Sequence, residues 1–235
     1  MKARPVKKLD PERSLGENAA RIIRVRLDEM RTLGPRALDG KTKAQHDMRI
    51  AAKRLRYVLE ATGFSFGKPA DTARRRARDL QDILGEIHDC AVMLPRVQGH
   101  LEELQRADAE GVRAKAGDAP DLDPRLAAQA HHRTAYRGLD VYAVYLEARR
   151  RLLFDRFEAF WQRQEERGTW SRLERAVDRY LDRARQARRT AKAAERARQR
   201  AEAAQRAART AEAQAERARL HREPASAPNV PQPPS

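Results

Sequence analysis

Cysteine and aromatic residues are scarce in this sequence of 235 residues, which contains one cysteine, Cys90, and 5% aromatics. A single cysteine forms neither an intramolecular disulfide nor a cage of thiolate ligands around a metal, and it fits a reducing compartment. No apolar run approaches the ~18 residues that a membrane span requires, and the first residues lack the apolar core of a signal peptide. We therefore expect a cytoplasmic protein that has no membrane-spanning helix.

Segments in which apolar and polar residues alternate are also missing. With 11 glycines and few β-branched runs, the composition argues against a sandwich or a barrel. Apolar residues recur instead at intervals of three and four, which is the period of amphipathic helices. The sequence predicts an all-α fold, an antiparallel four-helix bundle over residues 14–180 with helices at 14–33, 43–62, 70–107 and 139–166.

Helix-breaking residues set the expected ends of these helices. The dipeptide Gly34-Pro35 is expected to end the first helix, and Gly63 the second. The third helix is expected to bend at Pro95, because proline removes a backbone donor and clashes with the preceding turn. Residues 108–138 are rich in glycine, aspartate and proline, so we expect a long loop there.

The segments outside the bundle differ from it in composition. Residues 1–13 are basic and are expected to form a flexible arm. Residues 183–222 are almost entirely Ala, Arg, Glu, Gln and Lys, which predicts a long helix without the apolar stripe of a leucine-type coiled coil. Residues 223–235 are rich in proline and serine and are expected to be disordered.

The charge of the chain is strongly unbalanced. It has 50 Lys and Arg against 34 Asp and Glu, which gives a net charge of +16. Such an excess points to a polyanionic partner, either nucleic acid, polyphosphate or an anionic membrane face. Composition alone does not choose among the three.

Basic residues gather on one face of each of two helices. On the second helix, successive residues advance by about 100°, which places His46, Arg49, Lys53 and Arg56 on one side, away from the apolar face. We call these four residues the basic ladder. On the third helix, one face carries Arg74, Arg78, Gln81, Gly85 and His88. Like charges at this spacing repel each other, so the ladder is either an ordinary solvated face or an anion-binding site.

Three residues sit where ordinary packing would not place them. Gly85 lies in mid-helix at a cost of about 1 kcal/mol relative to alanine, so either a neighbouring helix or a ligand approaches the backbone there. Arg26 and Arg150 lie within the apolar stripes of the first and fourth helices. Each arginine either pairs with a carboxylate such as Asp89 or extends to the edge of the bundle, or else the seam is wet and open to an anion.

A longer pattern contains these residues. The stretch HDMRIAAKRLRY from His46, followed by LQDILGEIHDCAV from Leu80, resembles the CHAD family of helical domains over about residues 15–165. The resemblance implies a helical bundle that binds inorganic polyphosphate through basic residues. Its motif positions here are His46, Arg49, Lys53, Arg54, Arg56, Gly85 and Asp89. Typical members look like two similar halves with one motif copy in each, whereas this chain has one clear copy.

The leading hypothesis is non-catalytic binding of inorganic polyphosphate. The residues expected to bind it are His46, Arg49, Lys53, Arg54, Arg56, Arg74, Arg78, His88, Arg26 and Arg150, with Gly85 and Asp89 as structural positions. The alternative is a nucleic-acid-associated protein that binds through residues 183–222. Signatures of catalytic and metal sites are lacking, so we expect no enzyme, no cofactor and no metal.

The remaining expectations concern assembly and location. A weak homodimer that places the basic ladders of two chains opposite each other would bring two motif copies together, and polyphosphate would promote it. We expect a cytoplasmic location, with association to polyphosphate granules or to the nucleoid as further alternatives.

Overall fold

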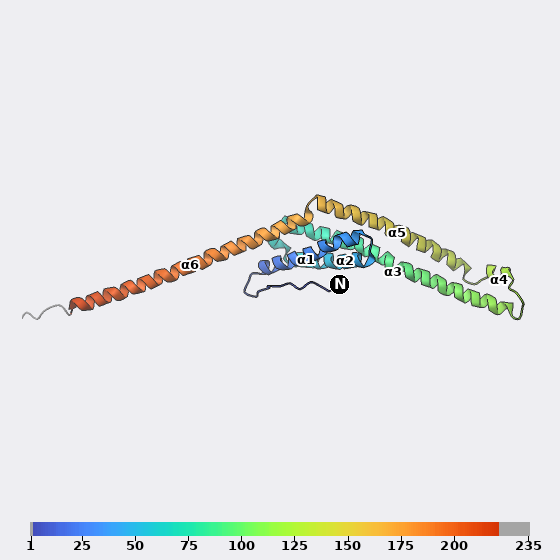
Figure 1. Ribbon diagram of the computed structural model, residues 1–235, viewed down its shortest axis with the longest axis horizontal. Helices are drawn as coiled ribbons and strands as arrows, with labels where there is room; N and C mark the ends of the chain where they lie inside the picture. Colours follow the sequence, from blue (N-terminus) through green and yellow to red (C-terminus); the bar gives the residue numbers. More distant parts are fainter. Residues whose placement is uncertain (1, 221–235) are drawn as a thin grey trace, which may run out of the picture. The chain divides into compact units, whose positions relative to one another are not determined.

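The computed structural model describes residues 2–220, and the chain divides into two units after Leu181. Its elements are α1 (Leu15–Leu38), α2 (Thr42–Thr62), the 3₁₀ helix η1 (Gly63–Phe66), α3 (Lys68–Ala116), α4 (Pro124–Ala128), α5 (Arg133–Glu166) and α6 (Thr169–Leu220) (Figure 1). The described residues contain no strand, so the predicted all-α fold is confirmed. The predicted disorder of residues 223–235 lies outside the described residues.

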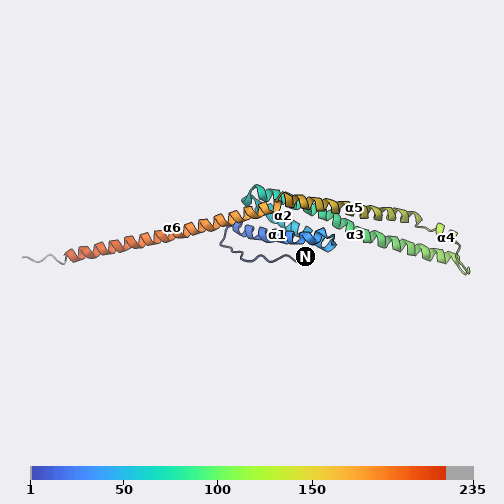
Figure 2. The same cartoon turned by 45° about the horizontal axis from the view of Figure 1, so that its top comes forward.

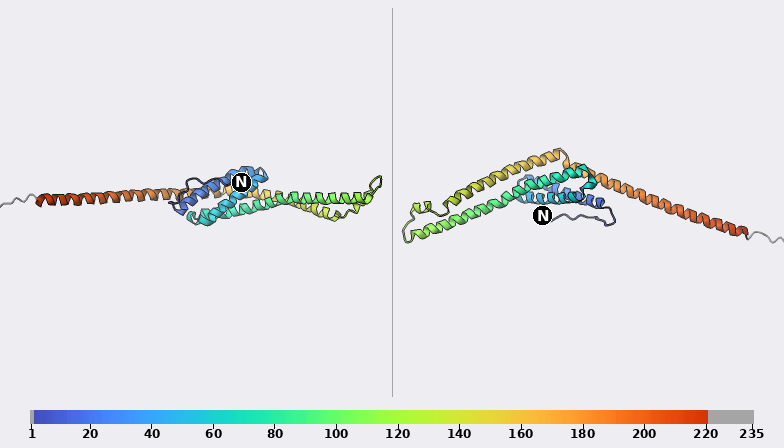
Figure 3. Two further views of the ribbon diagram at one scale, coloured as in Figure 1. Left: turned by 90° about the horizontal axis from the view of Figure 1, so that it is seen from below. Right: turned by 180° about the vertical axis from the view of Figure 1, so that it is seen from behind.

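In the first unit, α3 is the central helix. It contacts α2 and also α5, and α1 packs on α2 (Figure 2). The long α3 and α5 run side by side as a hairpin, which is also visible from behind (Figure 3). The core also includes Trp170, Leu173 and Val177 from the start of α6, all completely buried. A fifth helical segment therefore adds to the predicted four.

The apolar stripes read from the sequence form the core of this unit. Along α2, Met48, Ala51 and Leu55 are completely buried. The sequence predicts apolar stripes on α3 and α5 by the same helical spacing, and their buried members are Leu80, Leu84, Ile87, Leu146, Leu153, Phe157, Phe160 and Trp161. Burial of large apolar side chains is the main stabilising contribution of such a bundle, so the helical periodicity alone identified most of the core.

The predicted end of the first helix at Leu33 is wrong. The helix α1 continues through Gly34 and Pro35 to Leu38. Gly34 packs under the indole ring of Trp161, where an added Cβ would lie 2.9 Å from Cζ2. This packing, together with the buried Ala37, favours the helix strongly enough to offset the donor that Pro35 removes.

The third helix is also longer than predicted, and the loop after it is shorter. Pro95 lies inside a continuous α3, at an exposed position where water can solvate the carbonyl that proline leaves without a donor. The loop is confined to residues 117–132, with the short α4 inside it. Asp108 accepts hydrogen bonds from the backbone N–H of His132, at 2.9 Å, and from the Tyr136 hydroxyl. These bonds hold the far end of α3 against the start of α5.

The N-terminal arm contacts α1 at several points. Arg4 pairs with Asp28, and the backbone N–H of Asp10 donates to Asn18 Oδ1 at 3.1 Å. Ser14 caps the helix by accepting a hydrogen bond from the N–H of Glu17 at 3.3 Å. The arm is thus tied to both ends of the first half of α1, a set of contacts that its basic composition did not predict.

We predict that a chain ending at Leu181 unfolds at nearly the same temperature as the full chain. Residues 182–219 are almost all exposed, so their removal uncovers little apolar surface. A chain ending at Gly168 should lose its cooperative transition, because it lacks Trp170, Leu173 and Val177. Losing each buried side chain costs about 3 kcal/mol, and together these losses rival the whole stability of a domain. Thermal unfolding followed by circular dichroism distinguishes the two, and equal melting of both truncations would contradict the prediction.

Candidate anion-binding site

The basic ladder of α2 and the basic face of α3 meet along the line where the two helices pack. The rings of His46 and His88 have centroids 4.7 Å apart, and Arg49 Nε lies 3.3 Å from where a Cβ on Gly85 would be. Both pairs of residue numbers add up to 134 (46 + 88 and 49 + 85), as expected for two antiparallel helices joined by a short turn. The structure thus joins the basic ladder of α2 and the basic face of α3 into one surface, which we call the shared basic face.

The same register extends the shared basic face toward the turn. It places Lys53 opposite Gln81 and Arg56 opposite Arg78, since each of these pairs also adds up to 134. Because the turn is the four-residue helix Gly63–Phe66, the register cannot slip without straining it. Cations from two helices therefore follow one line over about three helical turns.

Gly85 is explained by a close side-chain contact. A Cβ at this position would lie in tight contact with the guanidinium of Arg49. Of the two alternatives for Gly85, close packing is therefore present in the structure, and the group that approaches is an arginine side chain of α2. This contact restricts the position of the Arg49 guanidinium. The Arg49 side chain is half-buried at the centre of the ladder.

Several polar atoms of the shared basic face are buried without a hydrogen-bond partner among the described residues. They are His46 Nδ1, Arg49 Nε, Arg56 Nε, Gln81 Oε1 and His88 Nδ1. Native proteins pair the large majority of such atoms, so each of these requires an explanation. Their concentration on one face is typical of a site shaped for binding at the expense of stability.

The cations of the face differ in the carboxylates that accompany them. Within residues 2–220, Arg49 and Lys53 form no ion pair, and Lys53 lies over the Tyr57 ring at 5.6 Å from its centroid. Toward the turn, Arg56 pairs with Glu60 at 3.3 Å. Arg74 pairs with Asp71 at 3.0 Å and Arg78 with Asp82 at 3.8 Å. The excess positive charge is therefore greatest at the His46–Lys53 end.

The electrostatics of this end are visible in His46. Burial lowers the pKa of its imidazole below the usual 6.5, and the nearby His88 and Arg49 lower it further, while Asp47 acts in the opposite direction. A positive neighbourhood makes it unfavourable to add another proton. The positive neighbourhood thus favours the neutral form of His46, and a bound anion would favour the charged form.

We predict that the free energy of unfolding falls as the pH is lowered from about 7.5 to about 5.5. The pKa of His46 is lower in the folded than in the unfolded chain, so the unfolded chain binds the proton more readily and acid favours unfolding. Denaturant titrations across this range measure the effect. The variant His46→Gln should show a weaker dependence, whereas His100→Gln, at an exposed position, should retain it. An unchanged pH profile in His46→Gln would contradict this assignment.

Two of the predicted binding residues hold a buried carboxylate instead. Glu29 is 1% exposed and pairs with Arg26 at 2.6 Å, and Arg54 approaches it at 4.0 Å from α2. The backbone N–H of Arg4 also donates to Glu29. The suggested partner Asp89 is exposed, so that suggestion is corrected: Glu29, three residues after Arg26 on the same helical face, is the counter-ion. This spacing is the signal by which the sequence could have revealed it.

Replacing Glu29 with glutamine should lower the stability of the chain by about 2–3 kcal/mol, because Arg26 and Arg54 would remain half-buried beside a neutral group. Arg54 is partly exposed, which keeps the expected loss below that of a fully buried pair. The matched control is Asp28→Asn, which removes an exposed partner of Arg4 and should cost well under about 1 kcal/mol. Equal losses from both variants in urea titrations would refute the central role of Glu29.

The last predicted residue, Arg150, belongs to α5 and contacts α2 one helical turn before His46, at the end of the shared basic face. It is half-buried on α5 and approaches Thr42 Oγ1 at 3.4 Å. The apolar stripe around it is interrupted there by a cavity of about 460 Å³, which Arg150 lines together with Gln45 and Phe154. The side chain therefore extends to the edge of the bundle beside this cavity, which is one of the three possibilities considered for it.

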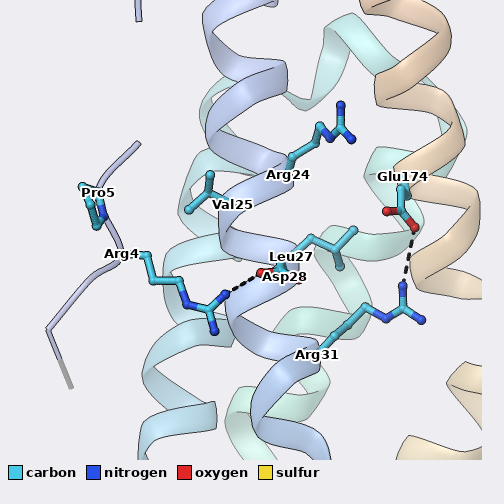
Figure 4. Close-up of a pocket in the computed structure, with 8 residues that line it drawn as sticks. All are labelled: Arg4, Pro5, Arg24, Val25, Leu27, Asp28, Arg31 and Glu174. Carbon is cyan, nitrogen blue, oxygen red and sulfur yellow. Dashed lines mark hydrogen bonds and ion pairs between the residues drawn. The ribbon is translucent and has the colours of Figure 1, made fainter. Parts of the chain in front are cut away.

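A second cluster of arginines lies along the outside of α1. Arg4, Arg24 and Arg31 line a surface cavity of about 510 Å³ (Figure 4). Arg4 pairs with Asp28, and Arg31 approaches Glu174 at 3.5 Å, as the dashed lines show. Arg24 approaches Asp178 at 3.3 Å. Since every arginine here has a carboxylate, this cavity is less suited to a polyanion than the shared basic face.

The comparison with protein families agrees with this geometry. Residues 2–98 match the family model of the CHAD domain, so the predicted resemblance is confirmed over this part of the chain. The match includes α1, α2 and the part of α3 that carries Gly85 and His88, and it ends before α5. It is shorter than the expected resemblance over residues 15–165. Searches of curated proteins and of solved structures found no match.

Residues 2–220 contain neither a candidate metal site nor a candidate membrane span. No group of three or more histidine, cysteine, aspartate or glutamate side chains is placed to hold a metal ion. None of the helices in this part of the chain is both long and apolar enough to cross a membrane.

Proposed function

We propose that the protein binds inorganic polyphosphate, without catalysis, on the shared basic face of α2 and α3. The observation that carries this proposal is the register that joins the His46–Arg49 end of the ladder to Gly85 and His88. It gathers cations on a line while Arg49 and Lys53 lack carboxylate partners within the described residues. The CHAD family match covers all of these positions.

The shared basic face suits polyphosphate better than it suits a nucleic acid. Polyphosphate carries about one negative charge per unit and has no bases, so its receptor needs a row of cations and few aromatic rings. Single-stranded nucleic acids are bound instead on exposed aromatic platforms. The one aromatic side chain beside the ladder, Tyr57, is occupied by Lys53 and Arg56, which lie over its ring.

The proposal assigns different roles to the predicted residues. Direct contacts to phosphate come from the ladder, His46, Arg49, Lys53 and Arg56, and from His88. Arg74 and Arg78 extend the site toward the turn, where an incoming anion competes with their aspartates. Arg26 and Arg54 form ion pairs with Glu29, so their proposed role is to stabilise the fold and not to bind phosphate.

Isothermal titration with long-chain polyphosphate tests the proposal. The double variant Arg49→Ala/Arg56→Ala should weaken binding about a hundredfold, because two charge-assisted contacts are lost. Binding should also weaken steeply with salt, and the variant should lower the log–log slope by roughly 1.5 units. The matched control is Arg156→Ala/Arg163→Ala, which removes the same charge from exposed positions of α5 and should bind almost normally.

Two outcomes would overturn this function. Equal weakening in both double variants would mean that net charge, and not the shared basic face, governs binding. Release of phosphate from polyphosphate in the presence of Mg²⁺ would contradict a non-catalytic role.

A nucleic-acid-binding role for the second unit is a separate candidate, favoured by the charge pattern of α6. At 100° per residue, five exposed cations fall within about 80° of one another on this helix. They are Arg185, Arg189, Lys192, Arg196 and Arg200. The chain ending at Leu181 separates the two functions, since it should keep polyphosphate binding and lose affinity for duplex DNA. Equal affinity of this truncated chain for both polymers would count against a polyphosphate-specific face.

A further inference from the structure

Helix α5 is apolar on two sides, and only one of them is covered. The covered side includes Leu146, Leu153 and Phe157, which lie in the core. On the other side, Val141, Val144, Tyr145, Ala148 and Leu152 follow one another at steps of three, one, three and four, so that they share one face. We call these five residues the outer stripe. Val144 is 70% exposed, Val141 63% and Leu152 59%.

The shape of the surface around the outer stripe suits packing against another helix. The outer stripe borders a surface cavity of about 710 Å³ between α3 and α5, lined by Leu94 of α3 and by Ala143 and Ala148 of α5. Val144 and Leu152 of the outer stripe line this cavity together with the smaller Ala143 and Ala148. A contiguous apolar stripe that a monomer leaves uncovered marks an interaction surface.

Charged residues flank the outer stripe. Their order is such that two antiparallel copies of the stripe would place opposite charges next to each other. Along one edge, Arg137 and Asp140 precede the stripe, and Arg151 and Asp155 lie at its end. In an antiparallel two-fold pair of α5 helices, the numbers of facing residues add up to about 293. Arg137 then faces Asp155 of the second copy, and Asp140 faces its Arg151.

The same arrangement pairs large apolar residues with suitable partners. Val141 then faces Leu152 of the second copy, and Tyr145 faces Ala148, a large residue against a small one. Glu147 lies near the two-fold axis, where it keeps Arg151 of its own chain as counter-ion at 2.9 Å. Both polarity and side-chain size are therefore self-complementary in one register, as an isologous interface requires.

We propose that the outer stripe is the interface of a homodimer, covered by the same stripe of a second copy in antiparallel orientation. Its mixture of acidic and basic flanking residues disfavours a polyanion or an anionic membrane as the occupant. This dimer differs from one in which two basic ladders face each other. Helix α5 contacts α3 through Arg149, which reaches Glu86 and Cys90. Glu86 and Cys90 lie about 100–160° around α3 from Gly85 and His88, so the shared basic face stays free in both copies.

Sedimentation equilibrium of the full chain at about 150 mM salt tests the proposal. The wild type should show the mass of two chains, and Leu152→Glu should raise the dissociation constant about a hundredfold or more, because each dimer would bury two unpaired carboxylates. The matched control is Leu122→Glu, at an exposed leucine in the loop before α4, which should dimerise like the wild type. Circular dichroism confirms that both variants remain folded.

A charge exchange tests the register itself. Arg137→Asp and Asp155→Arg should each weaken dimerisation, and the double variant should restore it, because the exchanged charges face each other again. A wild type that stays monomeric, or a dimer that Leu152→Glu leaves intact, overturns the proposal. A failure of the double variant to recover overturns the antiparallel register. Titration of Leu152→Glu with a short polyphosphate, which cannot reach both basic faces of a dimer, should match the wild type, and this keeps the result independent of the proposed function.

Discussion

The close packing of α2 against α3 through small residues is the constraint on which the candidate site depends. Ala52 of α2, and Ala73 and Ala77 of α3, lie on the sides of their helices next to the basic residues and are completely buried. One-carbon side chains let two helices approach closely, so that residues flanking the contact line can meet across it. The contact between the tilted imidazole rings of His46 and His88 and the contact between Arg49 and Gly85 follow from this approach. Larger core residues would preserve an all-α fold and separate the two halves of the basic face.

This close approach gathers charge and unpartnered polar atoms, both of which oppose folding. Repulsion between neighbouring cations in a helix amounts to a few tenths of a kcal/mol for each pair, and each unpaired buried polar atom costs about 1–3 kcal/mol. The apolar core offsets these losses, and it draws its largest side chain, Trp170, from α6. The Glu29 cluster ties α2 to α1 on the side away from the ladder. The structure thus separates the residues that stabilise the bundle from those that make it an anion receptor.

The sequence predicted correctly which face of a helix a residue lies on, but it did not predict which residues of different helices contact each other. Helical periodicity alone assigned the stripes of α2, α3 and α5 and the basic ladder, because the face of a residue follows from its number. The opposition of His46 and His88 depends on the length of the turn between two helices, which local patterns do not determine. The continuation of α1 through Pro35 had a similar cause, since the contact between Gly34 and Trp161 joins residues more than a hundred positions apart. Tertiary packing overrode local breaking signals there.

Helix α5 shows why one apolar stripe is an incomplete description of a helix. Its covered stripe satisfies the needs of the core, and Val144 and Leu152 lie on the opposite side, where a monomer gains nothing from apolar residues. The central helix α3 therefore separates two kinds of surface, a basic one that it forms with α2 and an apolar one beside α5. Because the two lie on different sides of α3, self-association need not compete with anion binding. Pairing of two chains would place two basic faces in one assembly, and a long polyanion that reaches both would gain affinity from the higher effective concentration of the second face.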